Sequence, residues 1–208
     1  MLSHSVNIFF TIVSGCSEYW ARAEVIDTRK FRHAGSVHTG IFVGNREIDF
    51  GQGGVHTRFS VFEELQEGTS FFSRTVWIFF LFFESMSLIW SMIGVVTCVF
   101  SMTSLAMDIS VAGPNGIYLW TVSHGGALAL FYSQFQSSFK ISMLLEEHHD
   151  IGFTTFNQAS LSYAFYMSLC ALFALYIPPL TLVVFTEKIA IGGRSKTPTN
   201  FDPTLMLY

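Results

Sequence analysis

Apolar residues in this chain gather into long runs that are separated by polar stretches. Residues 76–103, 116–139 and 161–186 are each predominantly apolar, and the first run contains a single acidic residue, Glu84. A helix needs about 20 mostly apolar residues to cross the roughly 30 Å of hydrocarbon in a bilayer. The pattern therefore predicts three transmembrane spans at these positions.

The first apolar segment, residues 6–20, is weaker. Its apolar part, residues 6–13, is followed by Ser14 and Gly15, and Glu18 ends the run. This length is short for a crossing helix and close to that of a signal-peptide core. We expect a short or truncated first span, while a cleaved signal and an interfacial segment stay open as alternatives.

Residues 21–75 form a long hydrophilic stretch that contains seven of the eleven Lys and Arg residues. Glycines divide it into pieces, and short apolar runs lie between them at 40–44 and 59–62. Polar and apolar residues interleave around these runs, which is typical of short strands bounded by turns. We predict a small β-rich lobe in this first loop, with both runs as strands.

Basic residues near the span ends indicate the orientation of the chain. Lys188, Arg194 and Lys196 directly follow the last predicted span, and such residues favour the cytoplasmic side. With four spans, the tail 187–208 is cytoplasmic, and the 21–75 loop lies outside together with the connection at 140–160. The whole chain, 1–208, is then a single membrane domain.

Composition changes the picture by excluding several classes of protein. Half of the residues are hydrophobic and only 12% are charged, which is about half the charged share of an ordinary soluble domain. The formal net charge of −4 gives no electrostatic support to a nucleic-acid partner. The lipid bilayer is the partner that this composition indicates.

The sequence contains no catalytic signature. P-loop, G-x-S-x-G, H-E-x-x-H and dinucleotide-binding patterns are missing, so we expect neither an enzyme nor a cofactor. His148 and His149 are adjacent beside two glutamates, whereas a chelating helical pair is spaced by four residues. We interpret residues 146–150 as a solvated acidic loop, His38 and His56 as surface residues, and expect no metal site.

The three cysteines, Cys16, Cys98 and Cys170, all lie outside the long hydrophilic loop. A disulfide framework in that loop is therefore excluded. We expect structural packing for all three thiols, with palmitoylation of Cys98 or Cys16 as the alternative.

Glu84 is the acidic residue within the second predicted span, and His124 in the next span is the polar residue suited to pair with it. Ionised groups within hydrocarbon usually face a partner or a cavity. The pair is either a polar clamp between two helices or part of a proton or ion pathway. We favour the clamp, because a pathway needs several such groups and the last span supplies none. Ser87 and Ser91 add a face where helices can approach closely.

The chain ends in Met206, Leu207 and Tyr208. A hydrophobic residue at the terminus and another two positions before it suit a PDZ groove, which captures such ends by strand addition. We expect this end to be a partner-binding site.

Four segments, in order along nearly the whole chain, resemble the clarins, small four-span proteins distantly similar to claudins. The most specific is 113–120, which closely matches the glycine-proline-x-glycine turn that opens the third span; the others are 40–44, 58–62 and the end at 207–208. The matching motif positions are Gly40, Phe42, Gly44, Gly113, Pro114 and Gly116, and Trp20 resembles the tryptophan that closes the clarin first span. The chain departs from most clarins because its loop has no cysteine and it has no Asn-x-Ser/Thr sequon. In its lack of loop cysteines it resembles the third vertebrate paralogue.

The resemblance implies a claudin-like bundle of four transmembrane helices with a small extracellular β-rich lobe. It also implies a non-enzymatic scaffold of the plasma membrane, tied to actin-rich domains of sensory hair cells, such as stereocilia, and to hearing. Its partners would be membrane or cytoskeleton-linked proteins, including a PDZ protein, and self-association is a further expectation. The alternative function is a small transporter or channel auxiliary subunit that uses Glu84 and His124.

Overall fold

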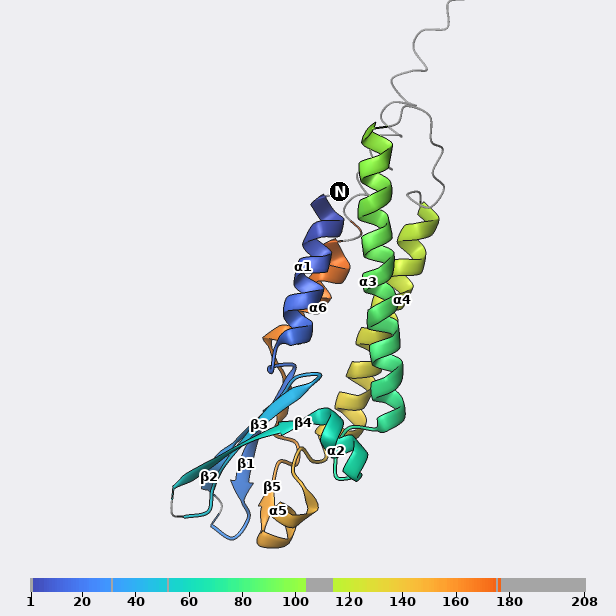
Figure 1. The fold of residues 1–208 in the computed structure, drawn as a ribbon. Coiled ribbons are helices and arrows are strands. Elements are labelled where there is room, and N and C mark those ends of the chain that lie inside the picture. Colours follow the sequence, from blue (N-terminus) through green and yellow to red (C-terminus); the bar gives the residue numbers. More distant parts are fainter. Residues whose placement is uncertain (1, 31, 52, 104–113, 175, 177–208) are drawn as a thin grey trace, which may run out of the picture. The chain divides into compact units, whose positions relative to one another are not determined.

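The computed structural model describes residues 2–30, 32–51, 53–103, 114–174 and 176 (Figure 1). They belong to a unit of residues 1–175, and a second unit, 176–208, is described at Tyr176 only. The helices are α1 (Leu2–Cys16), α2 (Val61–Glu67), α3 (Arg74–Thr103), α4 (Pro114–Gln134), α5 (Glu146–Ile151) and α6 (Tyr163–Ala174), and a π-helical turn, η1 (Phe135–Phe139), extends α4. The strands are β1 (Ala21–Asp27), β2 (Arg32–Thr39), β3 (Val43–Asp49), β4 (Gly54–Ser60), β5 (Phe153–Thr154) and β6 (Ala159–Leu161).

The predicted β-rich lobe is present, and its strands form one antiparallel sheet in the order β4-β3-β2-β1-β5, with β6 also paired to β1. Each of the two apolar runs is a strand only in part, however. Residues 40–42 form the turn between β2 and β3, where the Gly40 N–H donates to the Val43 carbonyl at 2.8 Å. The run 59–62 divides between the end of β4 and the start of α2. In both places the apolar residues pack at turns, which periodicity alone does not distinguish from strands.

The lobe also takes strands from outside the first loop. β5 pairs with Ile26 and Asp27, and β6 pairs with residues 21–23, all on β1. The assignment of the lobe to residues 21–75 alone is therefore wrong. Because one sheet contains both segments, the 21–75 loop and the connection after α4 must lie on the same side of any membrane that the helices cross.

The first helix ends at Cys16 and not at residue 20. The Ser17 N–H donates to the Ser14 carbonyl at 3.1 Å, and the Trp20 N–H donates to the Thr39 carbonyl of β2 at 2.9 Å. The chain leaves the helix because the backbone of Trp20 already joins the sheet. α1 is consequently 15 residues long, and the predicted segment 6–20 is helical only in part.

Four helices pack in contact as the pairs α3–α4, α1–α6, α1–α3 and α4–α6 (Figure 1). Within the described residues, α3 is the one helix that is long and apolar enough, over Arg74–Val96, to cross a membrane. The predicted segment 116–139 coincides with α4 and η1, and 161–186 begins with α6. Apart from Tyr176, the rest of that segment lies outside the described residues, as do the connection 104–113 and the tail 187–208.

Candidate functional site

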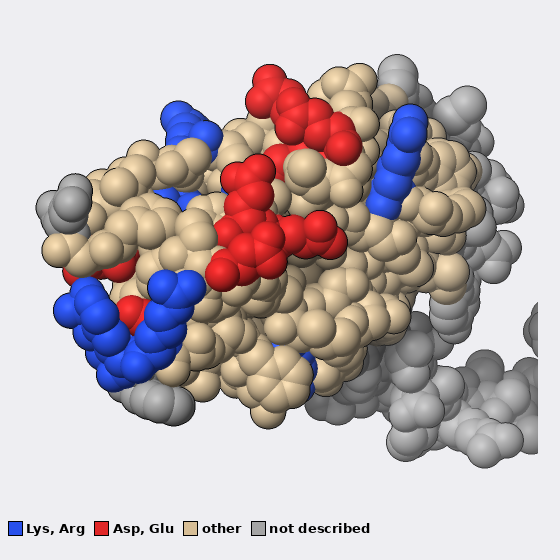
Figure 2. Space-filling view, turned by 90° about the horizontal axis from the view of Figure 1, so that it is seen from below, with Lys and Arg blue, Asp and Glu red and all other residues tan. Residues whose placement is uncertain are grey.

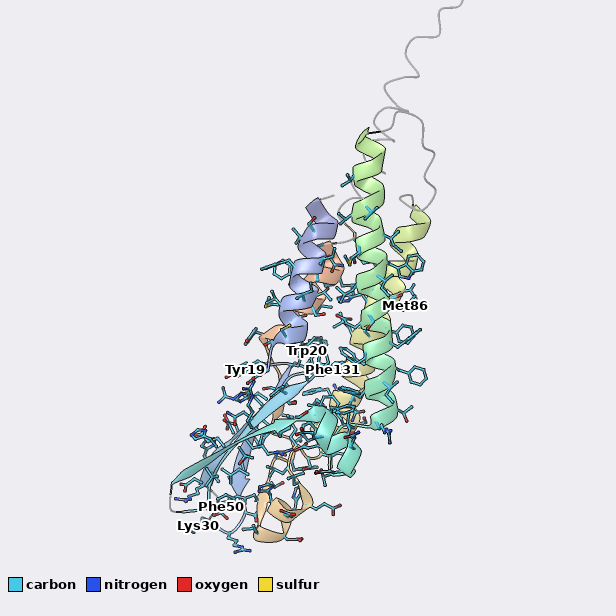
Figure 3. All side chains as sticks on the ribbon, in the orientation of Figure 1. Tyr19, Trp20, Lys30, Phe50, Met86 and Phe131 are labelled. Atoms are coloured by element: carbon cyan, nitrogen blue, oxygen red, sulfur yellow. The ribbon has the colours of Figure 1, made fainter. Side chains whose placement is uncertain are left out.

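Trp20 is fully buried just before β1, near the lower end of α1 in Figure 3. Its indole N–H donates to the Ser14 carbonyl, with an Nε1–O distance of 2.6 Å. Its ring contacts Phe80 of α3, Phe131 of α4 and Phe165 of α6, at centroid distances of 5.5, 4.8 and 6.2 Å. We call these four side chains the aromatic junction. One residue thereby fixes the start of the sheet to three helices and, through Ser14, to α1.

More rings continue from the aromatic junction into the lobe. Phe131 lies 5.8 Å from Phe139 of η1, which packs edge-on against Phe71 and Phe72 at 5.1 and 4.7 Å. Phe71 in turn lies 6.1 Å from Phe59 of β4. The high phenylalanine content therefore has a structural use here, because edge-to-face rings fill a core with defined geometry.

Arg46 of β3 and Glu64 of α2 form a buried, two-pronged ion pair. The Nη1–Oε1 and Nη2–Oε2 distances are 2.5 and 2.9 Å, and the two residues are 3% and 8% exposed. The Arg46 guanidinium also lies 3.9 Å above the Phe59 ring. No pattern in the sequence pairs these two residues, which are 18 positions apart. A bidentate pair has strict geometry, so it fixes α2 on the sheet.

Glu84 and His124 are brought together between α3 and α4. The Nδ1 atom of His124 lies 3.2 Å from Oε2 of Glu84, and the side chains are 0% and 9% exposed. The distance suits an ion pair, although the two groups are not aligned as a hydrogen bond. His124 Nε2 lies 3.0 Å from the Ser168 carbonyl; because a carbonyl can only accept, Nε2 carries the proton.

The last predicted span contains no charged residue, but it does supply a polar residue that the sequence analysis did not identify. Ser168 of α6 places its carbonyl 3.0 Å and its Oγ 3.2 Å from His124 Nε2, and it is fully buried. The polar contact therefore joins three helices rather than two. The serine was missed because its neighbours in the sequence are uniformly apolar.

A second polar contact holds α1 against α3. The Asn7 side-chain amide donates to the Ser91 hydroxyl at 3.2 Å, and Ser91 donates to the Ser87 carbonyl at 2.8 Å. Asn7, Ser87 and Ser91 are all fully buried. The serine spacing indicated a close helix approach, whereas Asn7 was not identified because nothing near it in the sequence marks its partner.

The glycine motif at 40–44 lies where α1 meets the lobe. A Cβ on Gly40 would lie 2.1 Å from the Ser17 carbonyl oxygen, and one on Gly44 would lie 2.3 Å from the Phe59 ring. Both positions therefore require the absence of a side chain. Phe42 between them is 49% exposed. Of the second motif, Gly113 lies outside the described residues, as do Met206, Leu207 and Tyr208, while Pro114 and Gly116 open α4.

Acidic side chains gather in the middle of the face seen in Figure 2, and basic side chains lie toward its edges. The 146–150 cluster is a short exposed helix, α5, rather than a loop.

Among the described residues, no group of three or more His, Cys, Asp or Glu side chains could hold a metal ion. The expected structural packing does not hold for Cys16 and Cys170, which are exposed; the side chain of Cys98 lies outside the described part.

Two histidines of the lobe differ from the surface character that the sequence suggested. His38 stacks on Tyr19 with ring centroids 4.2 Å apart, and burial lowers the pKa of its imidazole. His148 is half-buried near Arg46, and burial first, then the charge of Arg46, lowers its pKa. His56 is exposed, as expected.

A family model described as Clarin-2-like matches residues 20–175 of this chain, three quarters of its length. The chain belongs to the clarin family. The match begins at Trp20, the central residue of the aromatic junction, and includes the whole lobe and all of α6. No curated protein matches this clarin in sequence.

Family membership makes the chain a clarin-like membrane protein. The matched region contains Glu84, His124 and the 40–44 and 113–116 motifs, but not the tail at 206–208. Resemblance in the first loop and at the opening of α4 had identified the same family from the residues alone.

Proposed function

We propose that this clarin is a four-span, non-enzymatic organiser of the plasma membrane that acts through its extracellular lobe and its cytoplasmic tail. The observation that supports the proposal is the aromatic junction, where Trp20 contacts a phenylalanine from each of α3, α4 and α6. A lobe fixed to the helix bundle in this way presents a constant surface to other proteins. An organiser needs that rigidity, because a partner-binding surface that is already ordered loses less entropy on association.

The sheet gives the proposal its topology. β1 follows α1, and β5 and β6 precede α6, so one lobe gathers the chain from two separate connections. Four spans are the simplest arrangement that puts both connections outside and the tail 187–208 inside. The partners in this proposal are membrane or cytoskeleton-linked proteins, with a PDZ protein at Met206, Leu207 and Tyr208.

The sensory role is the finer part of the proposal. Clarin-like proteins of hair cells would maintain actin-rich membrane domains such as stereocilia, and this chain would do so by linking its lobe to a submembrane scaffold. Removal of Leu207 and Tyr208 should release the PDZ partner and disperse the protein from such domains while its surface delivery stays normal. Unchanged localisation and partner recovery would contradict the tail assignment.

Topology is tested by tagging both ends of the full chain and measuring antibody access in intact and permeabilised cells. Four spans predict that both tags are accessible only after permeabilisation. An exposed N-terminal tag with a hidden C-terminal tag would leave three spans and would overturn the proposed organisation. Loss of the N-terminal tag from the mature protein would show a cleaved segment and overturn it equally.

A second candidate, a small transporter or channel auxiliary subunit, is favoured by one observation. The Glu84–His124 pair is buried between helices and extends to Ser168. Glu84→Gln and His124→Ala should abolish ion or proton flux under this candidate. Under the organiser proposal they reduce folding and surface delivery, with no flux to lose.

A further inference from the structure

Two phenylalanines of the lobe are exposed beside the first turn of α3. Phe42, in the β2–β3 turn, is 49% exposed, and Phe62, in α2, is 53% exposed. The Phe62 ring lies 6.2 Å from that of Trp77 in α3. We call Phe42, Phe62 and Trp77 the aromatic ledge. Exposed aromatic side chains that gather in one place mark an interaction surface more often than isolated ones do.

The ledge is held in place by the backbone. The Trp77 indole N–H donates to the Ile41 carbonyl at 3.0 Å, and the Val61 N–H donates to the Phe42 carbonyl at 2.9 Å. These bonds tie the β2–β3 turn to the starts of both α2 and α3. The two phenylalanine rings are therefore exposed on a fixed support rather than on a free loop end.

The depth of the aromatic ledge relative to the proposed span follows from the position of Trp77 on α3. The apolar stretch of α3 begins at Arg74, and with a rise of about 1.5 Å per residue Trp77 lies only about 4.5 Å further along the helix axis. The next residues, Ile78 and Phe79, are 51% and 53% exposed. The ledge is thus continuous with the apolar surface by which α3 would face lipid.

We propose that the aromatic ledge inserts into the membrane leaflet on the lobe's side, at the boundary between phospholipid headgroups and acyl chains. Tryptophan is enriched at this depth because its ring is apolar and its N–H is polar, while the phenylalanine rings reach the acyl region. Arg74 is exposed one turn before Trp77 and meets the lipid phosphates. The inference rests on the proposed span at α3, and it fixes the lobe against the bilayer.

Phe50 serves as a control, because it tests whether any exposed phenylalanine of the lobe contacts lipid nonspecifically. Phe50 is 45% exposed, similar to Phe42, but it follows the other end of β3. At about 3.3 Å per residue, the eight residue steps from Phe42 through β3 to Phe50 separate the two positions by about 26 Å. Figure 3 shows Phe50 at the end of the sheet away from α1 and α3.

The test places a photoreactive p-benzoylphenylalanine at one position at a time in the full chain, in phosphatidylcholine vesicles. Phe42, Phe62, Phe50 and Phe82 are each replaced; Phe82 lies on α3 and is 57% exposed. After irradiation, mass spectrometry measures phospholipid adducts. We expect adducts at 42, 62 and 82, and at least about tenfold fewer at 50, because acyl chains end at the edge of the hydrocarbon core.

The outcomes distinguish failure of the aromatic ledge from failure of the proposed membrane span at α3. Adducts at 82 with yields at 42 and 62 as low as at 50 would overturn the ledge while leaving the α3 span intact. Cross-links from 42 or 62 to a second copy, without lipid adducts, would also overturn it and make the ledge a contact between copies. A lack of adducts at 82 would overturn the span and the ledge together.

Discussion

At the scale of single residues, Trp20 connects more of the structure than its exposed neighbours do. Trp20→Ala removes a fully buried indole and its bond to Ser14, and large-to-small changes at such sites cost about 3–5 kcal/mol. Trp20→Phe retains most of the packing and should cost about 1 kcal/mol, the net worth of one hydrogen bond. Unfolding of the detergent-solubilised chain, followed by circular dichroism, measures both losses.

The control for Trp20 is Phe9→Ala on α1, because Phe9 is 61% exposed and surface changes usually stay within about 0.5 kcal/mol. Equal losses for Trp20→Ala and Phe9→Ala would show that the aromatic junction does not hold the lobe to the helices.

Arg46 and Glu64 form the second residue-scale test. Arg46→Ala leaves the buried Glu64 carboxylate without its partner, which typically costs about 3–5 kcal/mol. The double variant Arg46→Met with Glu64→Leu removes both charges and should recover most of that loss, since apolar pairs replace buried ion pairs at little net cost. If the double variant unfolds as readily as the single one, the pair contributes through shape and not through charge.

His148 predicts a dependence of stability on pH. Its folded-state pKa lies below the ordinary 6.5, chiefly because of burial, so the unfolded chain takes up a proton first as the pH falls. The free energy of unfolding therefore decreases below pH 6.5, down to the folded-state pKa, and His148 adds no slope above that pH. His148→Asn should flatten this decrease in a pH series of unfolding curves. A slope identical to that of the parent chain would refute the assignment.

At the scale of elements, the turn between β2 and β3 depends on Gly40. A methyl group there would lie 2.1 Å from the Ser17 carbonyl oxygen, closer than any real contact, so the turn must move away from the end of α1. Gly40→Ala should lower thermal stability and surface delivery strongly. Gly15→Ala on α1 is the matched control, because nothing lies within 4 Å of its added carbon and alanine favours helix by about 1 kcal/mol. Similar losses for both variants would contradict the close approach at Gly40.

Several elements were predictable and others were not. The turn glycines located the lobe, and the apolar runs located α3 and α4, because these signals are local. The runs at 40–44 and 59–62 are strands only at residues 43–44 and 59–60; the rest was misread, since an apolar residue at a turn looks the same in sequence as one in a strand. β5 and β6 were missed entirely: at two and three residues, they are too short to show a period.

At the scale of the whole molecule, the sheet joins segments more than 130 residues apart. Ala23 of β1 pairs with Ala159 of β6, and neighbouring strands are close enough for a disulfide. The double variant Ala23→Cys with Ala159→Cys should therefore form a disulfide in the oxidising secretory pathway. Mass spectrometry detects it as a linked peptide.

The control for this bridge is Ala23→Cys with Thr57→Cys. Thr57 lies on β4, three strands from β1, about 14 Å away at 4.8 Å per strand, and should not cross-link. A bridge in the control, or none in the test pair, would contradict the pairing of β1 with β6.

The sequence by itself determined the apolar helices, the existence of a β-rich lobe and the clarin family, because hydropathy, turn glycines and short motifs are properties of neighbouring residues. It also predicted that Glu84 and His124 form a pair, since each is an ionisable residue within an apolar run. Only the tertiary structure decided that Ser168 joins them, that Arg46 meets Glu64, and that Trp20 contacts three helices. These contacts depend on how distant segments pack, and no local pattern records which of many similar phenylalanines, serines and charges will meet.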